Sequence, residues 1–239
     1  MKAKIIMLSA LGVASFGLTQ AANASWDSGA CSGGGPAPCI EYNDGTNTYH
    51  FNGDGSHSGD WHGHPGGGDF QFTGYTDLGC SLGQFYCELT LTGDVRKFQD
   101  GNGDWRIGVR VNSGSVAQGS EGDNECSNIS VGGFPWYVGD YPNDHTFGAS
   151  SGMLYTGTSS VYTGNVGDID VTYTVFGLPI SLVTGGHMHE VEYHNSNSSF
   201  RFGGTRDDTI YVDGAADNDS GCSVSGDLIL QNGDYLNLF

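Results

Sequence analysis

Residues 126–138 read C-S-N-I-S-V-G-G-F-P-W-Y-V, and this segment is the clearest indication of the fold. Its first half alternates apolar and polar residues, the pattern of a strand with one buried face. Pro135 cannot donate a hydrogen bond to a strand ladder, so we expect it at a sheet edge or at the start of a strand. Phe134 and Trp136 supply the densest aromatic area in the chain, and we expect them to anchor the core.

Similar strand patterns extend outward from this stretch. Residues 105–111 (W-R-I-G-V-R-V) place apolar side chains on one face and arginines on the other, and residues 99–105 (Q-D-G-N-G-D-W) predict a hairpin turn before them. The glycine pair 185–186 predicts a second tight turn, between strands at 180–183 and 187–194. Turn signals recur about every 8–12 residues, as is typical of sandwiches. The sequence therefore predicts an all-β fold, an antiparallel β-sandwich of jelly-roll-like form.

The first 24 residues have the pattern of a secretory signal peptide. Lys2 and Lys4 precede an apolar run at 5–18, and the small residues A-N-A at 22–24 form a cleavage signal. No later stretch has the length and apolar character of a membrane-spanning helix, so we expect no transmembrane segment after cleavage. The chain is therefore predicted to be secreted, to the periplasm or beyond the cell.

The composition divides the mature chain into an N-terminal segment, which we call the head, and a strand-rich domain. It also gives the chain a strongly negative net charge. Residues 25–69 form a Gly-, Ser- and Asp-rich N-terminal segment, and residues 70–239 are predicted to form the β-sandwich domain. Two of the 8 basic residues fall in the signal peptide, which leaves 6 against 27 acidic ones, a net charge of −21. Such a surface repels nucleic acid and anionic membranes, so no nucleic-acid partner is expected.

The six cysteines predict a disulfide-stapled fold. An even count behind a signal peptide is typical of a protein that matures in an oxidising compartment, and six cysteines allow 15 connectivities. Short spacing favours local bridges for the first four cysteines, which leaves one long-range bridge for the last two. The expected pairs are Cys31–Cys39, Cys80–Cys87 and Cys126–Cys222.

Two segments carry a resemblance to a known family. Cys126 stands a few residues before G-F-P-W-Y-V (133–138), and Cys222 begins a late alternating strand, C-S-V-S-G-D-L-I-L. With the signal peptide and the all-β pattern, these segments resemble the secreted protein activators of alkane oxidation. The resemblance implies a non-enzymatic role at the cell surface, in the biofilm matrix or at a hydrocarbon interface. It brings no catalytic residues with it.

Histidines occur in two H-x-H pairs that suggest metal binding. His62 and His64 lie in the head, close to His57, and His187 and His189 lie in a predicted strand. Residues two apart on an extended segment project from the same face, so each pair presents two imidazoles to a transition metal. The alternative is that these histidines merely face solvent at a hairpin mouth.

Strict alternation along residues 187–194 would divide the polar residues of this strand between its two faces. His187 and His189 would share a face with Val191 and Tyr193, and His194 would lie on the opposite face. The three histidines therefore cannot bind one ion unless the strand contains a bulge.

Acidic loops suggest calcium as the alternative metal. Asp100, Asn102 and Asp104 have the oxygen-ligand spacing of the first half of a calcium-binding loop. Trp105 and Val111 occupy the positions where a helix-flanked calcium loop needs glycine and glutamate, so a plain turn is favoured. A second acidic loop carries Asp213, Asp217 and Asp219.

Catalytic motifs are weak in this sequence. It has no G-x-S-x-G nucleophile elbow, and its closely spaced acids, such as Asp207 with Asp208, are more typical of a solvated surface than of a glycosidase. We therefore expect a non-enzymatic protein that contacts an apolar ligand or self-associates through an edge strand. A metal-binding module and a secreted hydrolase are the alternatives.

Overall fold

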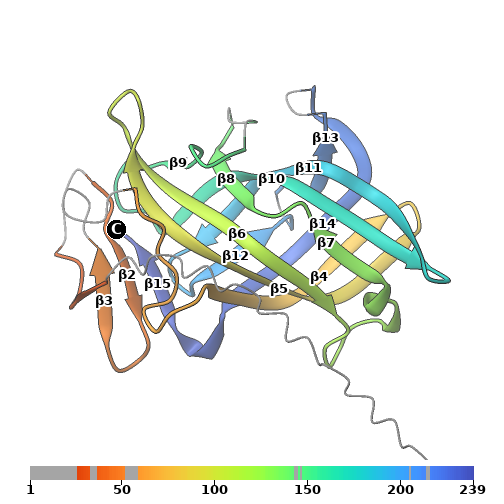
Figure 1. The fold of residues 1–239 in the computed structure, drawn as a ribbon, viewed down its shortest axis with the longest axis horizontal. Coiled ribbons are helices and arrows are strands. Elements are labelled where there is room, and N and C mark those ends of the chain that lie inside the picture. Colours follow the sequence, from red (N-terminus) through yellow and green to blue (C-terminus); the bar gives the residue numbers. More distant parts are fainter. Residues whose placement is uncertain are drawn as a thin grey trace, which may run out of the picture.

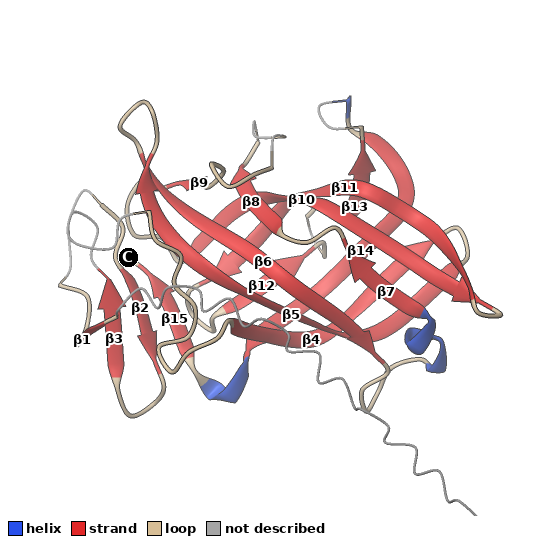
Figure 2. Cartoon of the chain, viewed as in Figure 1, coloured by secondary structure: helices blue, strands red, loops and turns tan. Residues whose placement is uncertain are grey.

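The structure is a computed structural model, and its described part is strand-rich (Figure 2). The predicted signal peptide and His57 lie outside the described residues. Within the described part, no helix has the length and apolar character needed to span a bilayer. The structure describes residues 26–32, 37–51, 59–142, 145, 147–204, 206–213 and 216–239.

The described residues form a larger sheet of 11 strands, all paired antiparallel (Figure 1). Pairings run from β4 through β5, β6, β8, β10, β11 and β12 to β14, which pairs with β4 again, so the sheet closes on itself. Its opposite walls pack sandwich-like on one apolar core, which confirms the predicted fold class. The strands are β4 (Phe70–Cys80), β5 (Gly83–Gln99), β6 (Trp105–Ala117), β7 (Ile129–Gly132), β8 (Trp136–Asp140), β9 (Met153–Leu154), β10 (Val161–Val175), β11 (Leu178–His194), β12 (Ser199–Phe202), β13 (Thr209–Val212) and β14 (Asn218–Leu230).

A smaller sheet joins the head to the C-terminus. Its order is β1-β3-β2-β15, and β2 pairs with β15, so it draws strands from both sides of the boundary predicted at residue 69. Leu236 and Leu238 of β15 are buried and line the same interior cavity as residues of the larger sheet. The head is therefore packed against the larger sheet. The strands are β1 (Asp27–Ser28), β2 (Ile40–Asn43), β3 (Thr48–Phe51) and β15 (Tyr235–Leu238).

The stretch at 126–138 anchors the core as predicted. Trp136 begins β8 directly after Pro135 and is buried, and its ring stacks on Phe134 at a centroid distance of 4.5 Å. The indole Nε1 donates a hydrogen bond to the carbonyl of Gly132, so this buried polar atom is satisfied. Strands β7 and β8 both pair with β10, which ties the stretch to the β10–β11 hairpin.

The disulfides confirm one predicted pair and correct the other two. Register explains why the predicted local bridge fails, because in the β4–β5 hairpin Cys80 lies opposite Gly83, whereas Cys87 lies opposite Thr76. A bridge needs Cα atoms within about 7 Å, and Cys87 lies four positions along β5 from the residue that faces Cys80. The observed bridges are Cys31–Cys39, Cys80–Cys222, which links neighbouring strands β4 and β14, and Cys87–Cys126, which links β5 to the 3₁₀ helix η1 (Asn124–Asn128).

No bridge joins the two segments that carry the family resemblance, so the predicted staple between them is wrong. The segments nevertheless face each other inside the fold. Val131 and Trp136 of the first and Val224 of the second line one interior cavity of about 50 Å³. Their proximity therefore rests on core packing.

The glycine pair 185–186 does not form the predicted turn. Strand β11 continues through it with a shift of register, and the hairpin turns instead at Phe176 and Gly177. Gly186 is small for a packing reason, since a Cβ there would lie 2.8 Å from a methyl carbon of Ile210. The correction makes β10 and β11 one long hairpin.

Candidate metal centre

Strand β11 carries His187 and His189 on the side of the sheet away from the core. Met188 between them points inward and lines the interior cavity. His187 is nonetheless 1 % exposed, because loops from elsewhere in the chain cover that side of the strand. The two imidazoles are thus held side by side, 5.0 Å apart between ring centroids.

A β-bulge changes the faces expected for this strand. Opposite Asn165 the strand carries two residues, His189 and Glu190, and Glu190 adopts a positive φ of 54°. Beyond the bulge, Val191 and Tyr193 line the interior. The prediction that they share a face with the H-x-H pair is therefore wrong, because one extra residue reverses the alternation.

Two loops complete a cluster of four ligands around the pair. His145 comes from the loop between β8 and β9, and Asp217 stands directly before β14. The Oδ1 atom of Asp217 lies 3.0 Å from Nε2 of His187, 3.2 Å from Nε2 of His189 and 3.6 Å from Nδ1 of His145. One ligand atom from each residue lies within 4.8 Å of the other three. We call these four residues the four-ligand cluster.

Packing holds the loop that carries His145 against the sheet. A Cβ at Gly167 would lie only 1.9 Å from the ring of Phe147, so the ring lies directly on the glycine backbone. The Phe147 ring is also 5.7 Å from that of His187. Only glycine at position 167 allows this contact, which places His145 two residues away from a fixed aromatic ring.

Tyr211 supports the two strand histidines from the neighbouring strand β13. Its ring lies 5.0 Å from that of His189 and 5.8 Å from that of His187. The Tyr211 hydroxyl donates a 2.6 Å hydrogen bond to Asp207, which raises the pKa of the phenol. Tyr211 is therefore fixed at both ends, and it limits how the imidazoles can rotate.

The electrostatics favour the metal-binding protonation states of His187 and Asp217. Burial lowers the pKa of His187 and outweighs the opposing effect of its hydrogen bond to Asp217, so its imidazole is neutral at neutral pH. Burial acts to raise the pKa of Asp217, but the hydrogen bonds of His187 and His189 outweigh it and leave that pKa below its usual value. Neutral imidazole and ionised carboxylate are the forms that bind metals.

The other H-x-H pair is built differently. His62 is 1 % exposed and its ring stacks on Phe51 at 3.9 Å. Both ring nitrogens of His64 are in hydrogen bonds, Nε2 with the Tyr42 hydroxyl at 2.6 Å and Nδ1 with the backbone N–H of Gly66 at 2.9 Å. The structure therefore does not bring His62 and His64 together with further ligands among the residues it describes.

The Asp100 loop forms the hairpin turn that its sequence also predicts. Oδ1 of Asp100 accepts the backbone N–H groups of Asn102 and Asp104, at 2.9 and 3.0 Å. Oδ2 accepts Nε of Arg106 at 2.8 Å. Both carboxylate oxygens are thus engaged within the turn, which favours the turn over a calcium site.

His194, the third histidine of β11, lies outside the cluster. Its Nε2 is 3.0 Å from Glu192, which also accepts a hydrogen bond from Arg206.

Sequence reasoning singled out the H-x-H pair but placed neither His145 nor Asp217 with it. The sequence indicated only that further ligands were needed, because two imidazoles do not complete a metal coordination shell. It did not show which residues of distant loops would supply them.

Comparison of the chain with protein-family models, with curated proteins and with solved structures found no match. Function is therefore inferred from the geometry of the four-ligand cluster.

Proposed function

We propose that this protein is a secreted, non-enzymatic protein that binds a divalent transition metal ion, preferentially zinc, through the four-ligand cluster. The observation that carries the proposal is the convergence of three imidazole nitrogens and one carboxylate oxygen within 4.8 Å of one another. The predicted signal peptide, the three disulfides and the resemblance to alkane-oxidation activators support the secreted, non-enzymatic part.

The distances fit a tetrahedral ion. Zinc binds imidazole nitrogen and carboxylate oxygen at about 2.0–2.1 Å, so the ligand atoms of a tetrahedral site lie about 3.3 Å from one another. The three distances from Asp217 Oδ1 to the histidine nitrogens are 3.0, 3.2 and 3.6 Å. These three distances are close to the separation of ligand atoms in a tetrahedral zinc shell.

Hydrogen bonding alone accounts for only part of the cluster. His187 and His189 are each within hydrogen-bond distance of Asp217. The Nδ1 atom of His145 is buried and makes no hydrogen bond to any residue that the structure describes. A buried polar atom without a hydrogen bond is costly, and a cation at the centre of the cluster would bind its lone pair.

The ligand types select the metal class and the role. Calcium takes 6–8 oxygen ligands, whereas imidazoles suit zinc, copper, nickel and iron. A tetrahedral shell filled by four protein ligands is typical of structural sites, because catalytic zinc keeps one position for water. The ion would join β11 to the loops that carry His145 and Asp217, and so would hold three distant segments together.

Metal analysis tests the proposal. We expect zinc titrated into the chelator-treated protein to bind with one ion per chain by calorimetry, and we expect Asp217→Ala to reduce the affinity at least about tenfold. The matched control is Asp219→Ala, because Asp219 lies in the same acidic segment but, among the described residues, its side chain accepts only the backbone N–H of Gly221. An absence of zinc binding in the wild-type protein, or equal losses in the two variants, would contradict the proposal.

A further inference from the structure

The β10–β11 hairpin ends in exposed apolar side chains. Phe176 is 101 % exposed, Leu178 69 % and Ile180 42 %. In Figure 1 the turn of this hairpin lies at the right-hand edge of the molecule, beyond the ends of the neighbouring strands. We call these three residues the apolar tip.

The backbone at the apex is unfavourable for the residue found there. Phe176 and Gly177 have φ values of 51° and 78°, the positive pair required by a type I′ turn. Asn, Asp and Gly suit the first position of that turn, whereas a bulky residue at positive φ is an outlier. Phe176 makes the turn less stable, and its exposed ring adds nothing to the core, so an external contact explains its presence.

The tip is also uncharged. No charged residue occurs from position 171 to 186, although the chain carries 27 acidic residues. Asp170 and His187 are the first acidic or basic residues on either side. An apolar, uncharged projection on a strongly acidic protein fits a partner that is apolar below its surface and carries no net negative charge.

Pro179 argues against strand addition at the tip. β11 meets β13 at His187 and β12 from Glu192 onward, so within the described residues its outer edge nearer the turn is unpaired. Pro179 faces Thr174, one pair beyond the hydrogen-bonded pair that closes the turn, where N–H groups point away from the partner strand. Proline has no N–H, so this outer edge lacks a donor that an added strand would need.

The missing donor suits a lipid environment, where an unpaired N–H would be costly to bury. We propose that the apolar tip inserts into the interfacial layer of a lipid bilayer with zwitterionic headgroups and attaches the protein peripherally to it. Phe176 supplies the deepest contact, and Leu178 and Ile180 follow it. The acidic body remains in water and disfavours bilayers rich in anionic lipid.

Vesicle co-sedimentation tests this inference. We expect the wild-type protein to sediment with phosphatidylcholine vesicles, and less with vesicles that also contain phosphatidylglycerol. Phe176→Asn should lower the partition coefficient about tenfold or more, since it removes a buried aromatic side chain. The same substitution places a favoured residue in the turn, so its melting temperature should equal or exceed that of the wild type.

The matched control is Tyr235→Asn. Tyr235 is an aromatic residue of β15, 49 % exposed and outside the hairpin, and its replacement should leave vesicle binding unchanged. Failure of the wild type to bind phosphatidylcholine vesicles, or equal binding by Phe176→Asn, would overturn the inference. A dimer in sedimentation velocity that Phe176→Asn abolishes would also overturn it, in favour of a second copy of the chain.

Discussion

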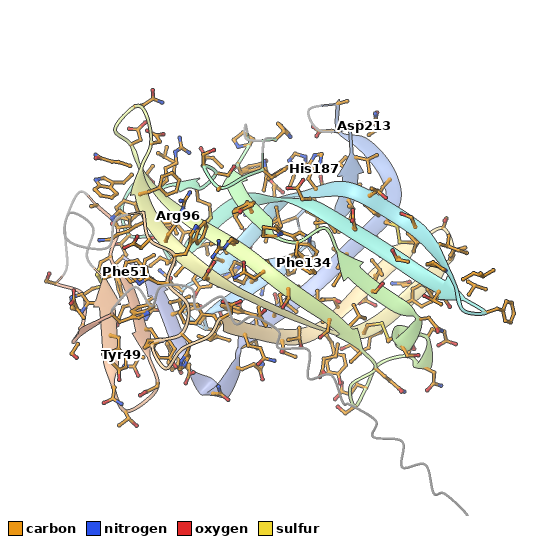
Figure 3. All side chains as sticks on the ribbon, viewed as in Figure 1. Tyr49, Phe51, Arg96, Phe134, His187 and Asp213 are labelled. Carbon is orange, nitrogen blue, oxygen red and sulfur yellow. A yellow bond between two sulfur atoms is a disulfide. The ribbon has the colours of Figure 1, made fainter. Side chains whose placement is uncertain are left out.

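The two H-x-H pairs of this protein share a spacing but have different surroundings. His187 and His189 converge on Asp217 and His145, whereas His62 stacks on Phe51 and His64 is hydrogen bonded at both ring nitrogens. Figure 3 shows Phe51 in the smaller sheet at the left and His187 on the larger sheet, so the pairs also occupy different parts of the fold.

The spacing of a histidine pair therefore does not by itself define a metal site. Residues that are two positions apart on a regular strand project from the same face, but this spacing does not bring further ligands to them. A site also needs ligands from other segments, which the loops before β9 and β14 supply to one pair only. At the other pair, aromatic rings and Tyr42 occupy the space where such ligands would lie.

The largest expected effect is on zinc affinity. Replacing both His187 and His189 by alanine should weaken zinc binding by on the order of a thousandfold or more, because four ligands share the roughly 10–16 kcal/mol of a structural zinc site. The double replacement of His62 and His64 should leave the affinity unchanged. Calorimetric titration measures both affinities. Loss of zinc binding in the His62/His64 variant, with binding kept in the His187/His189 variant, would contradict the proposed site.

Zinc should also stabilise the fold, and this gain should depend on His187 and His189 but not on His62 and His64. A ligand that binds the native state at 100 times its dissociation constant adds about 2.7 kcal/mol to the free energy of unfolding. This gain should appear in urea titrations of the wild type and of His64→Ala, and should be much smaller in His189→Ala. Equal gains in all three proteins would mean that the stabilising zinc binds elsewhere.

The head histidine should matter for stability in the absence of metal. His62→Ala removes a buried ring stacked on Phe51, and we expect a loss of about 2 kcal/mol in the free energy of unfolding. Zinc affinity should not change. A variant as stable as the wild type would show that this stack contributes little, and the contrast between the pairs would weaken.

The smallest expected effect concerns the hydrogen bonds around His64. The Tyr42 hydroxyl donates to Asp234 at 2.7 Å and contacts His64, so Tyr42→Phe should cost about 1 kcal/mol of unfolding free energy. Burial, followed by the bond to Asp234, raises the pKa of this phenol, so the tyrosine stays neutral across the physiological range. A loss of zinc affinity in this variant would tie the head to the metal site, against the account.

Local patterns predicted much of the fold. Alternation identified the strand at 105–111, the aromatic pair Phe134 and Trp136 identified a core anchor, and Pro135 was correctly placed before a strand. These features depend on neighbouring residues, whose chemistry the sequence displays directly.

Features set by pairing between distant segments were not predictable in the same way. The Cys80–Cys222 bridge follows from the register of β4 and β14, and the inward direction of Val191 follows from a bulge of one residue. His145 enters the four-ligand cluster only because its loop folds back over β11. No local sequence pattern indicates such contacts between distant segments, although the H-x-H pair at 187–189 lies where these segments come together.

Anomalous diffraction can locate a metal ion at the four-ligand cluster. The measurement uses a crystal of the protein with equimolar zinc, at the zinc absorption edge. We expect one anomalous peak about 2.0–2.1 Å from the ligand atoms of His145, His187, His189 and Asp217. An absence of any peak there, or a dominant peak beside His62 and His64, would contradict it.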